Sequence, residues 1–388
     1  MSDQIFASLD QTAQSSGAAA VIDCLLESER AEKRYHKLFD ALLMKKKFEW
    51  GLPVTRPTTF EEVPEEKRQE FEEYYVECAR NVGQMLIEDG QIAQAWVYFK
   101  TIQESDPIKE ALEQLGSEVS ELPDYDELLN IALYENAHPV LGVKWLIESH
   151  GTCNTITTLD QMMGQFDQQT RHEAAALMTN HLYGELCTSL EYNIKQSHPD
   201  IADGQSIHDL LNERDWLFEN GNYHIDVSHL NAVVRFARFL DGDDGELEKA
   251  IELAEYGSKL DKQLQYGGEP PFKDFYISHV HYLKVLAGRE IDEAFAYFQQ
   301  EIENDPDLPD KQLIAYVMVD LMMRIDKLDS AVELAKEYLA EVEDPNGFSF
   351  ADLCRRAGRP DILQEVAKEQ NDPLRYVYGL ISSKTAPA

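Results

Sequence analysis

The stretch VECARNVGQMLIEDGQIAQAWVYFKTIQESDP, residues 76–107, decides the fold that the sequence predicts. Residues 63–90 overlap the start of this stretch. Their apolar residues from Phe71 to Leu86 form one stripe with the 3.6-residue period of a helix. A proline and several acidic residues open this run and Gly90 closes it, which are signals of a helix start and stop. A second helical run follows the short EDGQ connection, so the stretch predicts a pair of helices.

The same pattern recurs along the chain. Helical runs of roughly 12–20 residues follow one another in pairs, joined by short connections such as DGDDGE, LAGRE and RIDKLD. No run shows the sustained alternation with period 2 that a half-buried strand requires. The sequence therefore predicts an all-α fold, and paired helices in series indicate an α-solenoid.

Residues 76–107 resemble a tetratricopeptide repeat (TPR). The matches are the two glycine positions, the small and aromatic positions of the second helix, and the terminal proline: Gly83, Gly90, Ala95, Phe99 and Pro107. Ala79 and Leu86 stand where the family has tryptophan and tyrosine. The small residue lets the two helices of a hairpin approach closely, and the aromatic residue fills the seam between successive hairpins.

Weaker copies of the pattern lie between about residues 230 and 345, at these positions: Ala294, Phe298, Pro306, Gly245, Ala250 and Ala331. The resemblance implies an α-α superhelix of stacked helical hairpins with partly irregular repeats. It divides the chain into an N-terminal helical segment, a TPR-like hairpin, an off-pattern helical region, further TPR-like hairpins and a C-terminal helical cap: 1–52, 64–107, 108–228, 229–345 and 346–388.

The chain is strongly acidic. Its 388 residues include 35 basic and 72 acidic side chains, which gives a formal net charge of −37 at pH 7. Such a surface repels phosphate backbones and anionic lipid, so we expect neither nucleic acid nor a membrane as partner, but a protein or peptide, and a basic one. Five dispersed cysteines without a CxxC pair and the lack of a signal peptide favour a cytoplasmic protein with reduced thiols.

The TPR resemblance also implies a concave groove that binds peptides. Carried onto this chain, the groove positions are Arg80, Asn81, Gln84, Arg235, His279 and Tyr316. Arginine and asparagine one turn from a glutamine suit a peptide carboxylate or backbone through charge-assisted hydrogen bonds. They resemble half of a carboxylate clamp, since the repeat does not continue after Pro107. In the competing interpretation, Arg80 pairs with a nearby glutamate.

The stretch NGNYHIDVSHL, residues 220–230, allows two interpretations. Asp226 or Ser228 suits the N-cap of the helix that follows, because its oxygen accepts a hydrogen bond from a free backbone N–H. Alternatively, His224, Asp226 and His229 form a metal or acid–base site, which His279 joins from the neighbouring helix.

No nucleotide-binding or nucleophile-elbow motif is present in the sequence. We therefore expect a non-catalytic helical-repeat scaffold without a cofactor. A metal-dependent enzyme or metal sensor is the first alternative. The second is a purely structural subunit of a larger assembly, with the groove filled by the helices of residues 108–226.

Overall fold

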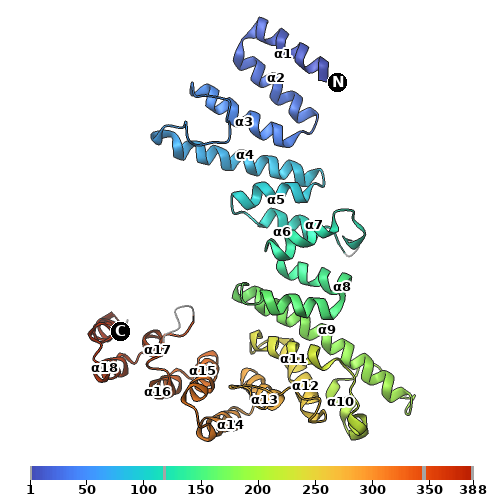
Figure 1. Ribbon diagram of the computed structural model, residues 1–388, viewed down its shortest axis with the longest axis vertical. Coiled ribbons are helices and arrows are strands. Elements are labelled where there is room, and N and C mark those ends of the chain that lie inside the picture. Colours follow the sequence, from blue (N-terminus) through green and yellow to red (C-terminus); the bar gives the residue numbers. More distant parts are fainter. Residues whose placement is uncertain (1, 117–118, 343–346, 386–388) are drawn as a thin grey trace. The chain divides into compact units, whose positions relative to one another are not determined.

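The computed structural model describes residues 2–116, 119–342 and 347–385 (Figure 1). Every regular element in these ranges is helical, and the β-pairing found there is one isolated bridge between Gly267 and Asp274. The predicted all-α class is therefore confirmed. The chain forms two compact units, Met1–Gly151 and Thr152–Ala388, and their boundary lies inside the off-pattern region 108–228. The boundary at 345/346 between the repeats and the cap lies outside the described residues.

The first unit is a succession of helices in which each packs against the next, from α1 to α6. Its elements are α1 (Ser2–Ser16), α2 (Ala18–Ala31), α3 (Tyr35–Glu49), η1 (Glu65–Lys67), α4 (Arg68–Glu88), α5 (Ile92–Thr101), α6 (Asp106–Glu113), η2 (Val119–Glu121), α7 (Tyr125–Leu129), η3 (Asn130–Tyr134) and the start of α8 (Pro139–Met162). Gly151 interrupts α8 with a φ of 77°, where the two units meet in the sequence.

The hairpin of α4 and α5 has the close contact that its small residues predict. Gly83 faces the ring of Phe99 so tightly that a Cβ there would lie 2.6 Å from Cε2 of the ring. Ala95 and Phe99 are both fully buried. Gly90 takes a φ of 73° in the turn between the helices, a conformation that favours glycine. The apolar period thus produces two helices, and the glycines let them turn and approach.

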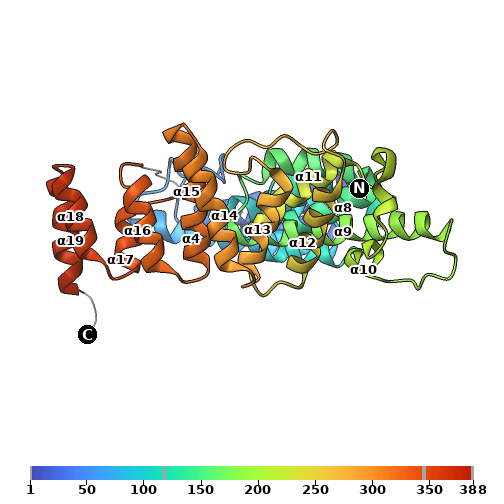
Figure 2. The same cartoon turned by 90° about the horizontal axis from the view of Figure 1, so that it is seen from below.

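The second unit continues the chain with α9 to α19. Its elements after α8 are α9 (Gln168–Lys195), α10 (Ile207–Leu211), η4 (Asp215–Gly221), α11 (Val227–Phe236), η5 (Ala237–Phe239), α12 (Gly245–Lys259), α13 (Phe275–Leu286), α14 (Ile291–Asn304), α15 (Leu308–Arg324), α16 (Leu328–Tyr338), α17 (Phe350–Arg356), α18 (Pro360–Glu369) and α19 (Pro373–Thr385). From α11 to α19 each α-helix packs against the next (Figure 2). Helix α9 packs against α10, α11, α12 and η5.

The core of this unit again depends on small residues at helix contacts. Ala294, Phe298 and Ala331 are fully buried. Gly257 of α12 lies directly against the ring of Tyr276 in α13. Among the described helices of the whole chain, none combines the length and the apolar character that crossing a bilayer requires.

Candidate functional site

The three groove residues predicted in the first repeat lie on one exposed face of α4. Arg80, Asn81 and Gln84 are all exposed. The guanidinium of Arg80 donates two hydrogen bonds to the carboxylate of Glu104, at 2.9 Å from Nε and 2.6 Å from a terminal nitrogen. The interpretation in which Arg80 pairs with a glutamate is therefore confirmed. A peptide carboxylate that binds the same edge of the Arg80 guanidinium has to displace Glu104.

The groove residues predicted in the later repeats have three different environments. Arg235 is exposed and its guanidinium contacts the carboxylate of Asp160 at 2.5 Å. His279 is only 1% exposed, with Nδ1 2.6 Å from the carbonyl oxygen of Phe275. A groove position requires exposure, so His279 is a core residue in this fold. Tyr316 is exposed and borders the pocket described below.

The stretch around Asp226 is a capped helix start. The Asp226 carboxylate accepts hydrogen bonds from the backbone N–H groups of Ser228 at 2.8 Å and His229 at 3.3 Å. Asp226 is thus the N-cap of α11, and His229 lies in its first turn. His224 is buried, and its backbone N–H donates to the hydroxyl of Tyr256 at 2.8 Å. Of the two interpretations left open by the sequence, the cap is confirmed.

The four candidate metal ligands of that region do not converge. Within the described ranges, the side chains close enough together to hold a metal ion are Asp305, Asp307 and Asp310. Their possible ligand atoms lie within 4.8 Å of one another. The buried Asp305 carboxylate already contacts the ammonium group of Lys273 and accepts the backbone N–H of Asp307 at 3.0 Å. Asp305 and Asp307 belong to the turn that precedes α15, and Asp310 lies in the first turn of that helix.

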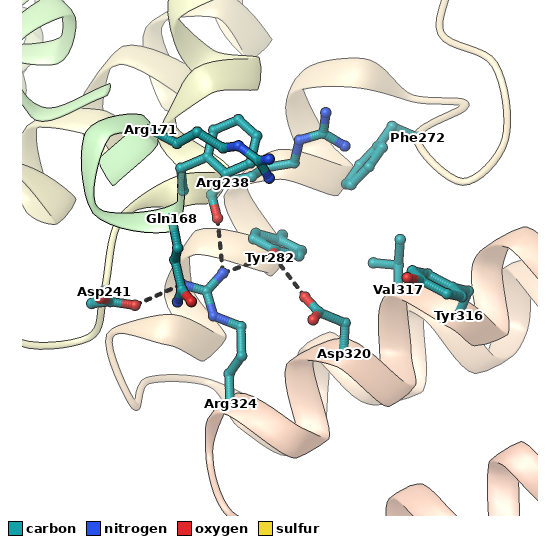
Figure 3. Close-up of a pocket in the computed structure, with 11 residues that line it drawn as sticks. Gln168, Arg171, Arg238, Asp241, Phe272, Tyr282, Tyr316, Val317, Asp320 and Arg324 are labelled. Atoms are coloured by element: carbon teal, nitrogen blue, oxygen red, sulfur yellow. Dashed lines mark hydrogen bonds and ion pairs between the residues drawn. The ribbon is translucent and has the colours of Figure 1, made fainter. Parts of the chain in front are cut away.

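A pocket of about 490 Å³ opens within the unit Thr152–Ala388 (Figure 3). Its walls come from the first turn of α9, from η5 and the residues after it, from α13 and the segment before it, and from α15. The lining residues are Gln168, Arg171, Arg238, Phe239, Asp241, Phe272, Tyr282, Tyr316, Val317, Asp320 and Arg324. Three arginines and two aspartates give this lining a formal charge of +1 in a chain of −37.

Arg324 fixes the floor of the pocket. From the last turn of α15, one terminal nitrogen donates to the carbonyl oxygen of Arg238 at 2.8 Å and to the hydroxyl of Tyr282 at 3.0 Å. The other donates to the carbonyl oxygen of Leu240 and to the Asp241 carboxylate, the latter at 3.1 Å. These bonds join α15 to the end of η5, so Arg324 has a structural task and few donors left for a ligand.

The hydrogen-bond chain continues from Arg324 to Asp320. The hydroxyl of Tyr282 accepts from Arg324 and donates to the carboxylate of Asp320 at 3.3 Å. Burial raises the pKa of Tyr282 to about 12, so it stays a donor at neutral pH. Burial also raises the pKa of the Asp320 carboxyl, and the positive charge of Arg324 opposes this rise.

Arg171 and Arg238 face the pocket with donors to spare. Nε of Arg171 donates to the carbonyl oxygen of Phe166 at 2.8 Å, and one terminal nitrogen reaches that of Gly164 at 3.4 Å. Nε of Arg238 donates to the carbonyl oxygen of Arg235 at 3.1 Å. Burial lowers the pKa of Arg238, yet arginine remains protonated at any physiological pH.

Phe272 is one of the aromatic residues of the pocket wall. The guanidinium of Arg238 lies over its ring, 4.9 Å from the centroid. The ring of His279 stacks on Phe272 with centroids 4.2 Å apart and planes 20° apart. Burial lowers the pKa of His279 to about 3, so this histidine is neutral and adds no charge beside Arg238. Tyr316 and Val317 add apolar surface from α15.

Sequence reasoning found only Tyr316 among the residues that line the pocket. The others are dispersed between residues 168 and 324, and no local spacing relates them. One signal was available in VVRFARFL, residues 233–240, where Arg238 interrupts an apolar run. A charged residue at such a position is either paired or functional.

A scan against protein-family models, a search of curated proteins and a search of solved structures each found no match. Function is therefore inferred from the geometry of this chain alone. The resemblance to tetratricopeptide repeats stays a prediction.

Proposed function

We propose that this chain is a cytoplasmic, non-catalytic helical-repeat scaffold of the TPR type, which binds a segment of a partner protein or a peptide. The pocket in Thr152–Ala388 carries the proposal, because four helical elements that are far apart in sequence jointly form its walls. Repeat proteins bind partners on surfaces that successive repeats build together.

The packing of the second unit supports a repeat architecture. Each helix from α11 to α16 contacts the next one, and α11 with α13 and α13 with α15 form contacts between alternate helices. Hairpins stacked in series produce this pattern, since the first helix of each hairpin touches the first helix of the next. The buried small residues Ala294 and Ala331 lie at the family's close-contact position.

Two properties of the charge distribution describe the proposed partner. The net charge of −37 attracts a basic surface over long range. The pocket lining, with three arginines and two aspartates, favours an anionic or strongly hydrogen-bonding group at close range. A basic protein or peptide that places one such group in the pocket satisfies both.

Affinity purification from the source cell tests the proposal with two charge-reversal variants. The pocket variant carries Arg171→Glu and Arg238→Glu, and the groove variant carries Arg80→Glu and Arg235→Glu. We expect the wild type and the groove variant to recover the same partner, and the pocket variant to lose it. Recovery should also fall as salt rises from about 50 mM to about 500 mM, because screening weakens attraction between exposed charges.

Circular dichroism of each variant controls for misfolding. Loss of the partner from the groove variant alone would move the binding site to the face that the TPR resemblance implies. Equal recovery by all three proteins at every salt concentration would contradict the scaffold proposal for both surfaces.

A further inference from the structure

Arg238 forms no ion pair with a described residue of the pocket. Its Nε donates to a backbone carbonyl, and its terminal nitrogens have no hydrogen-bond acceptor and no carboxylate within 4.0 Å among residues 2–116, 119–342 and 347–385. The guanidinium is half-buried and lies over Phe272. Burial removes part of the water around this cation, and its terminal nitrogens stay accessible from the pocket. An anion there would gain charge-assisted hydrogen bonds.

The two aspartates of the pocket do not serve as this anion. Asp241 pairs with Arg324 at 3.1 Å. Asp320 accepts the hydroxyl of Tyr282 at 3.3 Å. Asp320 attracts Arg238 across the pocket, but neither carboxylate lies within ion-pair distance of Arg238. The terminal nitrogens of Arg238 are therefore open to a ligand.

Arg171 strengthens the positive end of the pocket. It lies in the first turn of the 28-residue helix α9, whose N-terminal end carries a partial positive charge. Its second terminal nitrogen donates to no described residue, because the two backbone contacts use Nε and the other terminal nitrogen. Figure 3 shows the side chains of Arg171 and Arg238 extending over the same side of the pocket.

The remaining walls select among anions. Guanidinium groups match a carboxylate through paired, parallel hydrogen bonds. The nearby negative charges of Asp241 and Asp320 oppose a dianion more than a monoanion. Phe272 and Tyr316 offer apolar surface beside the cations, and about 490 Å³ lies within the size range of ligand pockets.

We infer that the pocket binds a carboxylate attached to an apolar or aromatic body, with Arg238 and Arg171 holding the carboxylate and Phe272 contacting the body. The inference rests on the proposed function, because it gives the chemistry of the partner group at that same site. The carboxylate can belong to a peptide or to a free small molecule, and the experiment below separates these sources.

Ligand-observed NMR with the full chain tests the inference using phenylacetate, phenylacetamide and inorganic phosphate as probes. Phenylacetate and phenylacetamide differ only in the charged group. We expect phenylacetate to bind at least about tenfold more tightly than the amide, which is the effect of about one charge-assisted bond. Phosphate should bind more weakly than phenylacetate. Equal binding of acid and amide would overturn the inference.

Four variants identify the residue responsible. Arg238→Gln should weaken the binding of phenylacetate at least about tenfold. The affinity of Arg238→Lys should lie between those of the wild type and Arg238→Gln, because lysine keeps the charge and loses the planar fork. Arg235→Gln is the matched control: it removes an arginine three residues away whose side chain pairs outside the pocket with Asp160, and it should leave affinity unchanged. Arg171→Gln repeats the test if the Arg238 variants do not fold. Retained affinity in a folded pocket variant would contradict the inference.

A competition experiment then separates the two sources. The peptide acetyl-Gly-Phe with a free C-terminal carboxylate and its C-terminal amide are each added to bound phenylacetate. Displacement by the acid alone assigns the site to peptide carboxylates, and no displacement by either assigns it to free carboxylates. If phenylacetate fails to bind while partner recovery still depends on Arg171 and Arg238, the carboxylate inference fails and the scaffold proposal stands.

Discussion

Replacing Gly257 with alanine tests how closely α12 and α13 pack. A Cβ at this position would lie 2.2 Å from Cε1 and 2.3 Å from Cδ1 of the Tyr276 ring, where ordinary contact begins at 3.4 Å. The ring is fully buried, and the Tyr276 hydroxyl donates to the side chain of Asn231 at 2.5 Å. It therefore has neither space nor freedom to turn away, and the two helices have to separate by more than 1 Å.

The expected effect is the difference between two opposing contributions. Alanine is better than glycine inside a helix by about 1 kcal/mol. Overpacking a buried contact costs about 1–3 kcal/mol, and a backbone-borne Cβ against a fixed ring belongs at the upper end. We therefore expect Gly257→Ala to lower the free energy of unfolding by about 2 kcal/mol. Gly184→Ala in α9 is the matched control, since its Cβ would meet no atom within 4 Å, and it should be stabilising.

Hydrogen exchange measured along a urea series is the appropriate assay. The chain has two compact units, so one global signal would mix their transitions, whereas peptides from α12 and α13 report on the contact itself. A Gly257→Ala variant as stable as Gly184→Ala in these peptides would refute the reasoning. It would mean that Tyr276 does not pack on the backbone of α12.

Three further predictions concern side chains whose roles the structure assigns. Asp226→Ala should speed exchange of the first amides of α11 and cost about 1 kcal/mol, whereas Asp226→Asn should keep the cap; unchanged exchange would contradict the assignment. Burial raises the pKa of Asp320 above its ordinary 3.8, so ionisation penalises the folded state as pH rises through that raised pKa. The urea midpoint of Asp320→Asn relative to wild type should therefore increase from about pH 4 to about pH 8, and a constant difference would refute this. Lys47 is fully buried and lies 3.8 Å from the carboxylate of Glu62, which is one-third exposed. Lys47→Met should destabilise Met1–Gly151 by about 2 kcal/mol, and adding Glu62→Gln should restore part of the loss, as measured by urea unfolding; no restoration would show that the pair is not coupled.

Local sequence patterns determined the helices and their ends. The cap of α11 could be predicted because the Asp226 carboxylate accepts hydrogen bonds from backbone N–H groups only two and three residues further along the chain. The hairpin of α4 and α5 could also be predicted, since Gly83, Gly90 and Phe99 lie close together in the sequence, in the two helices and the turn that joins them. The apolar stripe that contains His279 predicted a helix, but the same histidine also suited a groove. Packing against Phe272 decided that it is buried.

The candidate site is a product of the tertiary structure. The sequence determined an all-helical, acidic chain, because helical period, caps and charge depend on neighbouring residues or on composition. It could not place Arg171 beside Arg238, which is 67 residues further along the chain, or beside Arg324, which is 86 residues beyond Arg238. Only the packing of α9, η5, α13 and α15 brings these charges to one pocket, since helix contacts between distant segments depend on the summed shape of many side chains.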